Sequence, residues 1–295
     1  MKEKLSIGVD FGGTKIKFGL VTVGGSILGE TITLPTGAGR KADEIMATMI
    51  GGIEAIINSP ACMSDQLLGI GIGSPGPLDL KNGIILSPPN LPTLHNFPLK
   101  QVLEDHFKLP VELNNDGNCF VLGEAFFGAA QNANYVCGVT LGTGFGCGIV
   151  LNRKIFSGAT GTAAEVWCSP YLDRTFEEYG SAREVVRIFQ RLTSEARTAK
   201  EIHDLAQQGN RHAIDAFAEY GKHLGCMLSI IVNLLDPDTI VVGGSVSHAW
   251  PFFEKRLLQH LFENINDAPR KHVKCVPAAL GDDAGLLGAA ALLFS

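Results

Sequence analysis

Apolar and polar positions alternate along this chain with two spacings, one typical of strands and one typical of helices. Strand-like runs at Leu5–Phe11, Lys15–Val23 and Ser26–Leu34 predict a three-stranded meander, with Gly24-Gly25 as a hairpin turn. Helical spacing follows at Ala42–Ile57. The same criteria then predict a strand at Leu67–Gly73, a helix at Phe97–Phe107, a strand at Val111–Asn114 and a helix at Gly117–Phe127.

The pattern then begins again with a second meander, at Tyr135–Leu141, Gly146–Leu151 and Lys154–Phe156. The elements predicted after it are helices at Ala182–Leu192, Lys200–Gln208, Arg211–Leu235 and Trp250–Phe262, strands at Thr239–Val242 and Val273–Pro277, and a final apolar helix at Ala284–Phe294. This order predicts an α/β protein with repeated halves.

A repeated meander followed by alternating strands and helices is the organisation of the actin-like ATPase (ribonuclease H-like) fold. We therefore expect two similar α/β domains, with nucleotide and substrate meeting in the cleft between them. The first domain is expected at residues 1–116 and the second at 117–283. The last helix, within 284–295, is expected to pack back on the first domain.

Two glycine-rich turns, each between apolar strands, carry the first indication of chemistry. They lie at Asp10–Lys15 and Leu141–Gly146. Glycine lets backbone N–H groups approach a phosphate closely, and a carboxylate at Asp10 could hold a hydrated Mg²⁺ beside it. A third segment, Gly71–Gly76, matches G-x-G-x-x-G, but Pro75 and Pro77 favour a loop where a dinucleotide site needs a helix.

The composition of the chain limits the classes of molecule that it could bind. The chain has 295 residues, 45% of them hydrophobic and 18% charged, and a net charge of −6 without a basic run, which argues against nucleic acid or an anionic membrane. Its most apolar stretches are too short to span a bilayer, and no signal-peptide pattern opens it. The seven cysteines are scattered, as expected of reduced thiols, so a cytoplasmic protein is predicted.

With both turns in view, the chain resembles the ROK family of sugar kinases, and its bacterial glucokinase-like members in particular. The segments that carry the resemblance are Asp10–Lys15, Gly73–Asp79, Pro89–Leu91, Asn115–Asn118, Leu141–Gly148 and Asp236–Gly244. It implies transfer of the γ-phosphate of ATP, with Mg²⁺, to the 6-hydroxyl of a hexose. Glucose is the default substrate. Mannose, fructose, N-acetylmannosamine, N-acetylglucosamine, polyphosphate as donor and a non-catalytic sugar-sensing regulator stay open.

The resemblance also implies a role for individual residues. Asp116 would be the base that takes the proton from the sugar hydroxyl, although the same residue could simply cap the following helix. Asn115, Asn90 and Gly76 would contact the sugar, with ordinary turn chemistry as the alternative for the last two. The residues implied at the nucleotide are Asp10, Gly12, Gly13, Thr14, Lys15, Gly142, Thr143, Gly144, Gly243 and Gly244.

Two further carboxylates, Glu165 and Glu177, are implied as acceptors for sugar hydroxyls, with Glu178 as the alternative register for the second. Many family members bind a structural zinc nearby, through a cysteine-rich segment and a histidine. This chain has Cys168 at the histidine position and no other cysteine or histidine between Glu165 and Ser181. One thiol cannot form a closed tetrahedral site, so no structural zinc is expected. Relatives are often dimers, so a homodimer is expected.

Overall fold

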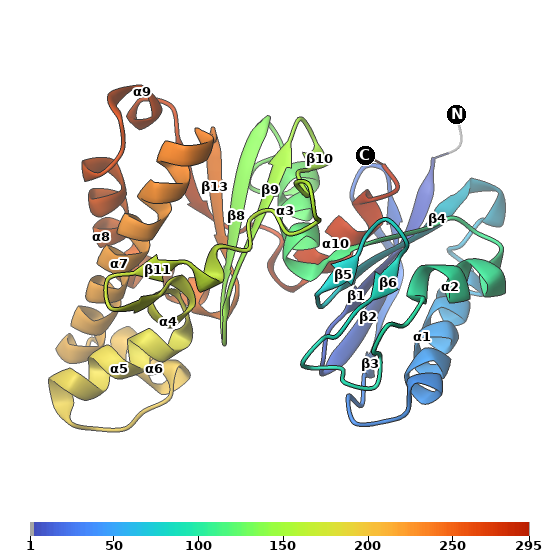
Figure 1. Cartoon of the computed structure of the whole chain (residues 1–295), viewed down its shortest axis with the longest axis horizontal. Coiled ribbons are helices and arrows are strands. Elements are labelled where there is room, and N and C mark those ends of the chain that lie inside the picture. The colour runs from blue at the N-terminus through green and yellow to red at the C-terminus, as the bar shows by residue number, and fades with distance from the viewer. Residues whose placement is uncertain (1–2, 295) are drawn as a thin grey trace. The chain divides into compact units, whose positions relative to one another are not determined.

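The computed structural model describes residues 3–294, which form two compact units (Figure 1). The first unit consists of residues 1–132, 150–163 and 279–295. The second consists of residues 133–149 and 164–278. The chain therefore leaves the first unit, returns to it briefly, and ends in it.

The first unit is built on a five-stranded sheet of order β3-β2-β1-β4-β7. β1 pairs antiparallel with β2 and parallel with β4, which pairs parallel with β7. Helices α1 and α2 cover one face, and α3 and α10 cover the other (Figure 1). The bounds are β1 Leu5–Phe11, β2 Lys15–Thr22, β3 Ile27–Pro35, β4 Leu67–Ser74, β7 Val111–Asn115, α1 Ala42–Ile57, α2 Leu99–Phe107, α3 Asp116–Phe127 and α10 Ala284–Ala291.

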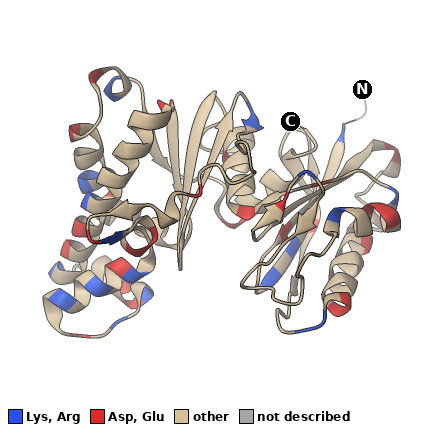
Figure 2. Cartoon of the chain, in the orientation of Figure 1, with Lys and Arg blue, Asp and Glu red and all other residues tan. Residues whose placement is uncertain are grey.

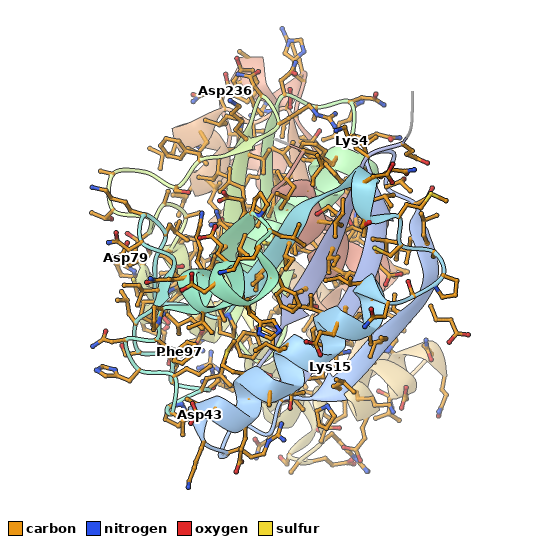
Figure 3. The ribbon with its side chains drawn as sticks, turned by 90° about the vertical axis from the view of Figure 1, so that its right-hand side faces the viewer. Lys4, Lys15, Asp43, Asp79, Phe97 and Asp236 are labelled. Carbon is orange, nitrogen blue, oxygen red and sulfur yellow. The ribbon has the colours of Figure 1, made fainter. Side chains whose placement is uncertain are left out.

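Figure 3 shows this unit from the side of α1, with Lys4 before β1 and Lys15 at the start of β2 at opposite ends of the strands. Successive strand residues point to opposite faces of a sheet. Ile7 and Val9 accordingly belong to the core that contains α1, whereas a side chain at Gly8 would collide with the backbone of α10. The small residues of β1 therefore mark the face on which α10 lies.

β4 shows the same division, and it explains the G-x-G pattern of the sequence. Ile70 and Ile72 are fully buried on the α1 side. A Cβ on Gly71 would overlap the carbonyl oxygen of Ala289 in α10, and one on Gly73 would lie 3.1 Å from the Cβ of Cys119 in α3. No helix opens after β4, so the dinucleotide interpretation is excluded by the structure as it was by the sequence. These glycines allow two helices to approach the sheet closely.

The second sheet has the order β10-β9-β8-β13-β14, and residues 150–163, with the end of β9 and with β10, are grouped with the first unit. The core of the second unit lies between β8, β13 and the helices α5–α8. The bounds are β8 Tyr135–Leu141, β9 Phe145–Leu151, β10 Lys154–Ile155, β13 Thr239–Gly243, β14 Lys274–Pro277, α5 Ala182–Thr193, α6 Ala199–Gln207, α7 Arg211–Leu235 and α8 Trp250–Glu263.

The compact units differ from the division expected from the sequence. Residues 117–132 lie in the first unit, because α3 packs against α10 so closely that a Cβ on Gly123 would collide with the carbonyl oxygen of Ala284. The final helix packs against α3, β1 and β4 of the first unit. Short elements outside the expected set are β5 Leu78–Asp79, β6 Ile84–Ile85, β11 Pro170–Tyr171, β12 Arg174–Thr175, α4 Phe176–Gly180 and α9 Asp267–Arg270.

Charged side chains of both signs are interspersed over the helices of each unit (Figure 2). Within residues 3–294, none of the helices has the length and apolar character required to cross a membrane.

Candidate active site

The first phosphate turn joins β1 to β2. The Gly12 N–H donates to the Lys15 carbonyl oxygen at 3.0 Å, which closes the turn. Thr36, which is fully buried, holds the turn in place through two hydrogen bonds. Its hydroxyl donates to the Gly12 carbonyl oxygen at 2.7 Å, and its backbone N–H donates to the Thr14 carbonyl oxygen at 2.9 Å. Thr36 was not predicted, and only its place just after the third strand of the meander could have indicated it.

Asp10 lies on the face of β1 that meets α10. A Cβ on Gly285 would be 3.1 Å from the carboxylate of Asp10, so glycine at this helix position makes room for the acid. Burial raises the pKa of Asp10 above its usual value, while the positive charges of Lys15 and Lys17 act in the opposite direction. Lys17 is itself held by Asp283, at the start of α10. The carboxylate therefore lies at a helix start, among compensating charges.

Three parallel strands end at the same edge of the first sheet, and they bring the predicted chemistry together. Asp10 of β1 pairs in register with Gly73 of β4, which pairs with Asn114 of β7. Neighbouring strands are about 4.8 Å apart, so Asp10 and Asn114 are separated by about 10 Å across the sheet. Asn115 and Asp116 follow directly, at the start of α3. The predicted metal-binding and base positions thus share one edge.

The structure separates the capping role from Asp116. Asn115 is the N-cap of α3, and its side-chain oxygen accepts the Gly117 N–H at 2.9 Å. Asp116 is the first helical residue, and its Oδ1 also accepts that N–H, at 2.8 Å. The sequence had offered Asp116 itself as the cap, which is wrong because Asn115 holds the extended backbone of an N-cap. Asp116 is therefore not the N-cap, although its carboxylate adds a contact at the start of α3.

The other residues predicted to contact the sugar lie around this edge of the first unit. A Cβ on Gly76 would be 3.3 Å from Nδ2 of Asn115, so the two residues are neighbours. A Cβ on Gly13 would be 3.1 Å from that of Asn90, which places Asn90 against the first phosphate turn. The first unit thus collects Asp10, the turn at 12–14, Asn90, Gly76, Asn115 and Asp116.

The second phosphate turn, between β8 and β9, belongs to the second unit. The Gly142 N–H donates to the Gly144 carbonyl oxygen at 3.0 Å, and the Ala182 N–H at the start of α5 donates to the Gly142 carbonyl oxygen at 2.8 Å. Gly244, at φ +84°, follows β13 and lies so close to the backbone of Leu141 that no side chain fits there. The turns after β8 and β13 are therefore adjacent.

A cavity of about 290 Å³ opens next to this pair of turns. Ser245, directly after Gly244, lines it together with Ala182, Val246 and Phe217. Lys200, His203 and Asp204 of α6 supply polar groups, as do Ser245 and His248. A mostly apolar cavity with a few polar groups suits a planar heterocyclic base with an attached sugar. The sequence analysis predicted Gly243 and Gly244 in this region but not most of the lining, which comes from helices that are distant in the chain.

Glu177 and Glu178 have different partners. Glu178 forms a capping box with Thr175: its Oε2 accepts the Thr175 hydroxyl at 3.0 Å, and its own N–H donates to that hydroxyl oxygen. Glu177 instead forms an ion pair with Arg183 at 3.0 Å, beside the second phosphate turn. Glu178 thus stabilises the start of α4, and Glu177 lies beside the second phosphate turn.

Glu165 lies in a tight turn that this chain builds from its own residues. The indole N–H of Trp167 donates to Oε2 of Glu165 at 2.6 Å, and the thiol of Cys168 donates to the Glu165 carbonyl oxygen at 3.6 Å. Cys168 and Trp167 are both exposed. Trp167 therefore orients the carboxylate predicted to accept a sugar hydroxyl, a contact that the sequence did not reveal.

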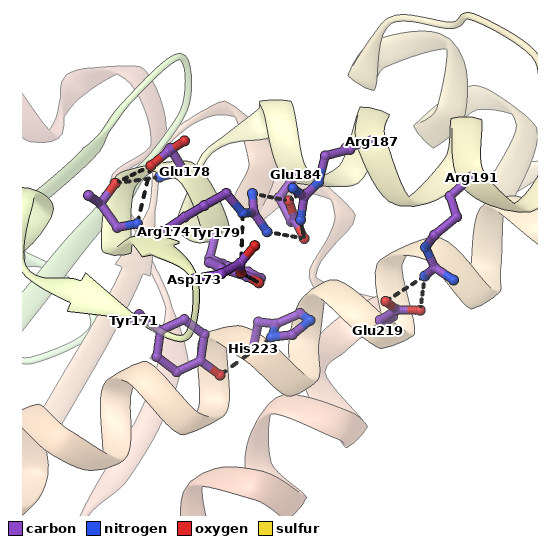
Figure 4. A network of polar contacts seen from close by, with 11 residues as sticks. Tyr171, Asp173, Arg174, Glu178, Tyr179, Glu184, Arg187, Arg191, Glu219 and His223 are labelled. Carbon is purple, nitrogen blue, oxygen red and sulfur yellow. Dashed lines mark hydrogen bonds and ion pairs between the residues drawn. The ribbon is translucent and has the colours of Figure 1, made fainter.

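A polar and aromatic network, shown in Figure 4, orders the segment after Cys168. Arg174 pairs with the buried Glu184 through Nη1 and Nη2, at 3.0 and 3.3 Å, and its guanidinium lies 3.6 Å above the ring of Tyr179. The Tyr179 hydroxyl donates to Asp173 at 2.6 Å. Burial raises the pKa of Glu184, although Arg174 counteracts it. The pair thus ties β12 to α5.

Tyr171 completes this network on the side of α7. Its ring meets those of Phe176, Tyr179 and His223 edge-on, with centroids 5.0–6.0 Å apart. Burial lowers the pKa of His223, which favours the neutral imidazole, and its Nδ1 shares a hydrogen bond with the Tyr171 hydroxyl, 3.4 Å away. Side-chain packing therefore orders the segment between Cys168 and α5.

We expect the purified protein to contain no stoichiometric zinc and to keep its melting temperature in the presence of a chelator. Among the described residues, no group of three or more His, Cys, Asp or Glu side chains is placed to hold a metal ion. A structural zinc site needs about four such ligands. Elemental analysis gives the metal content, and a melting curve with and without chelator gives the effect of its removal. About one zinc per chain, lost together with activity, would contradict the expectation.

Comparison with known proteins defines the class. The family model of the ROK family matches residues 6–295. A glucokinase from Halalkalibacterium halodurans is 30% identical, with 98% of this chain and 94% of the relative aligned. A xylose repressor from Caldicellulosiruptor bescii is 27% identical, with 98% of this chain and 78% of the relative aligned.

Solved structures give the same result. The ROK family glucokinase from Streptomyces griseus, in complex with glucose and AMPPNP, superimposes with a TM-score of 0.80 at 32% identity over 98% of both chains. The fold predicted from the sequence, with mixed α/β sheets in two actin-like ATPase domains, is confirmed. The chain belongs to the ROK family, as its resemblance to the sugar kinases of that family implied.

Proposed function

We propose that this protein is an ATP-dependent hexose kinase that transfers the γ-phosphate of ATP to the 6-hydroxyl of glucose. The observation that supports the proposal is the shared edge of β1, β4 and β7, where Asp10 lies about 10 Å across the sheet from Asn114, the residue directly before Asn115-Asp116. That spacing leaves room for a phosphoryl group and a hydroxyl between them. The glucokinase relatives support phosphoryl transfer to a sugar.

In this proposal, Asp116 accepts the proton of the attacking hydroxyl, and Asn115 and Asn90 hold neighbouring hydroxyls of the sugar. Backbone N–H groups of the turns at 12–14 and 142–144 donate to phosphate oxygens. Phosphoryl transfer depends mainly on such positioning and on neutralising the phosphate charge. The cavity beside Ser245 would take the adenosine of the nucleotide.

The residues present suit a magnesium ion bound with the nucleotide. Mg²⁺ prefers oxygen ligands and is commonly held by one or two carboxylates, waters and substrate phosphates. Asp10 offers such a carboxylate, and the charge of Asp282 acts on it from nearby. Bound there, Mg²⁺ would neutralise phosphate charge. A site of this kind needs no cluster of three protein ligands, which agrees with the described residues.

An Asp10→Asn variant is expected to require more Mg²⁺ for half-maximal activity and to bind glucose with unchanged affinity, because Asp10 lies on the phosphate side of the edge. Titrating Mg²⁺ in a coupled ADP-release assay measures the first effect, and calorimetry with glucose measures the second. Asp43→Asn serves as the control, since it removes the same charge from an exposed position at the start of α1. Loss of glucose affinity with an unchanged Mg²⁺ requirement would place Asp10 on the sugar side.

The identity of the sugar is decided by an ADP-release assay with glucose, mannose, fructose, N-acetylmannosamine and N-acetylglucosamine, each with ATP and with polyphosphate. Highest kcat/KM for glucose with ATP supports the proposal. Sugar binding without turnover on any acceptor would favour the second candidate, a sugar-sensing regulator, which the likeness to a xylose repressor supports. The homodimer and the cytoplasmic location stay predictions.

A further inference from the structure

Arg183 is a cation placed directly on the second phosphate turn. It is the second residue of α5, one position after Ala182, whose N–H is bonded to Gly142. Its Nη2 donates to the Thr143 carbonyl oxygen at 3.1 Å and to Oε1 of Glu177 at 3.0 Å. The turn itself, Gly142-Thr143-Gly144, carries no charge. Arg183 therefore brings positive charge to backbone expected to meet phosphate.

The guanidinium has capacity for another partner. Both of its contacts use Nη2, whereas a guanidinium has five N–H donors, so three donors on Nε and Nη1 are available. The side chain is 61% exposed and that of Glu177 is 31% exposed, so an incoming anion can reach the pair. Arginine binds phosphate oxygens in a two-pronged geometry that lysine cannot provide.

We propose that Arg183 contacts the terminal phosphate of the bound nucleotide and that Glu177 competes with this phosphate for it. In the free protein, Glu177 neutralises Arg183. When a nucleoside triphosphate occupies the turn, the guanidinium exchanges the carboxylate for a phosphate oxygen and keeps its contact with Thr143. The inference rests on the proposed kinase function, because it requires a nucleoside triphosphate at residues 142–144.

The opposing roles of the two residues give effects of opposite sign. Arg183→Gln is expected to raise the Kd of AMPPNP about tenfold to a hundredfold, the range for one lost hydrogen-bonded charge, and that of ADP much less. Glu177→Gln is expected to lower the Kd of AMPPNP, because Arg183 is then released. If the pair merely braced the turn, both variants would weaken binding. Arg183→Lys is expected to have an intermediate Kd for AMPPNP, since lysine keeps the positive charge but lacks the two-pronged hydrogen-bonding geometry of the guanidinium.

Calorimetric titration with AMPPNP and with ADP, without sugar, tests the proposal on the full-length protein. The matched controls are Arg191→Gln and Glu219→Gln, which disrupt an ion pair between α5 and α7 whose side chains are 57% and 38% exposed. The controls are expected to bind both nucleotides as the wild type does. Melting curves verify that every variant is folded.

The outcomes are separable. Three results would overturn the role of Arg183: equal losses of AMPPNP and ADP binding in Arg183→Gln, no loss in that variant, or weaker AMPPNP binding in Glu177→Gln. In each case the proposed function would still hold, provided that the wild-type protein binds nucleotide. A wild-type protein that binds neither nucleotide would overturn the proposed function, and this inference with it. Should Arg183→Gln fail to fold, Arg183→Lys and Glu177→Gln together decide between competition and bracing.

Discussion

An Asp116→Asn variant is expected to lose activity by a factor of about 10²–10⁴ in kcat while binding glucose and AMPPNP nearly as the wild type does. Removal of a general base typically costs this much, because the attacking hydroxyl must then release its proton without a positioned acceptor. A coupled ADP-release assay measures kcat, and calorimetry measures both affinities. The melting temperature is expected to change little, since Asn115 is the N-cap of α3.

The matched control is Asn115→Ala, which removes the cap from the same turn. It is expected to lower stability by about 1 kcal/mol and to weaken sugar binding. Near-normal kcat in Asp116→Asn would show that another group accepts the proton. Unfolding of that variant would show instead that its contact with the Gly117 N–H is essential to α3.

A Gly288→Ala variant is expected to lower the free energy of unfolding by about 3 kcal/mol or more, the upper end of the range for overpacked cores. Its added methyl group would overlap the carbonyl oxygen of Cys119, which is backbone and can move only if α3 moves. Urea unfolding, followed by circular dichroism, measures the loss. Gly51→Ala is the control.

Gly51 is an exposed position within α1, where an added Cβ meets nothing within 4 Å. Alanine there is expected to raise stability by up to about 1 kcal/mol, because it is the better helix former. A loss of less than about 1 kcal/mol in Gly288→Ala would mean that α3 and α10 can separate at small cost. The contrast tests whether close helix contact, rather than loss of a glycine, is responsible.

The long helices and strands were predicted well from the sequence, because the spacing of their apolar residues can be read within each segment. The limits of α1, α7 and β1 coincide with the expected ones, since each contains several repeats of its own period. Two-residue strands such as β11 and β12 have no period to detect. The domain boundary near Asp116 differed from the observed one, because the side of the molecule to which α3 belongs is decided by its packing against α10, far along the chain.

In the candidate site too, some features could be predicted from the sequence and others could not. Asp10 lies near the end of β1, and Asn115-Asp116 lie where β7 ends and α3 begins, so their place at a sheet edge could be anticipated from order alone. The residues that hold the two phosphate turns in place could not be anticipated in this way. Thr36 acts on the first turn across 24 residues, and Arg183 reaches Thr143 across 40. Such contacts depend on how strands and helices meet, which no single stretch of sequence contains.

The place of α10 in the chain has a consequence for how the protein folds during synthesis. α10 covers β1 and β4, yet it follows the whole of the second unit in the sequence. Until the ribosome has made residues 284–291, one face of the first sheet lacks one of its two covering helices. The second unit, by contrast, is complete at residue 278. The core of the second unit can therefore be complete before the face of the first sheet that carries Asp10 receives α10.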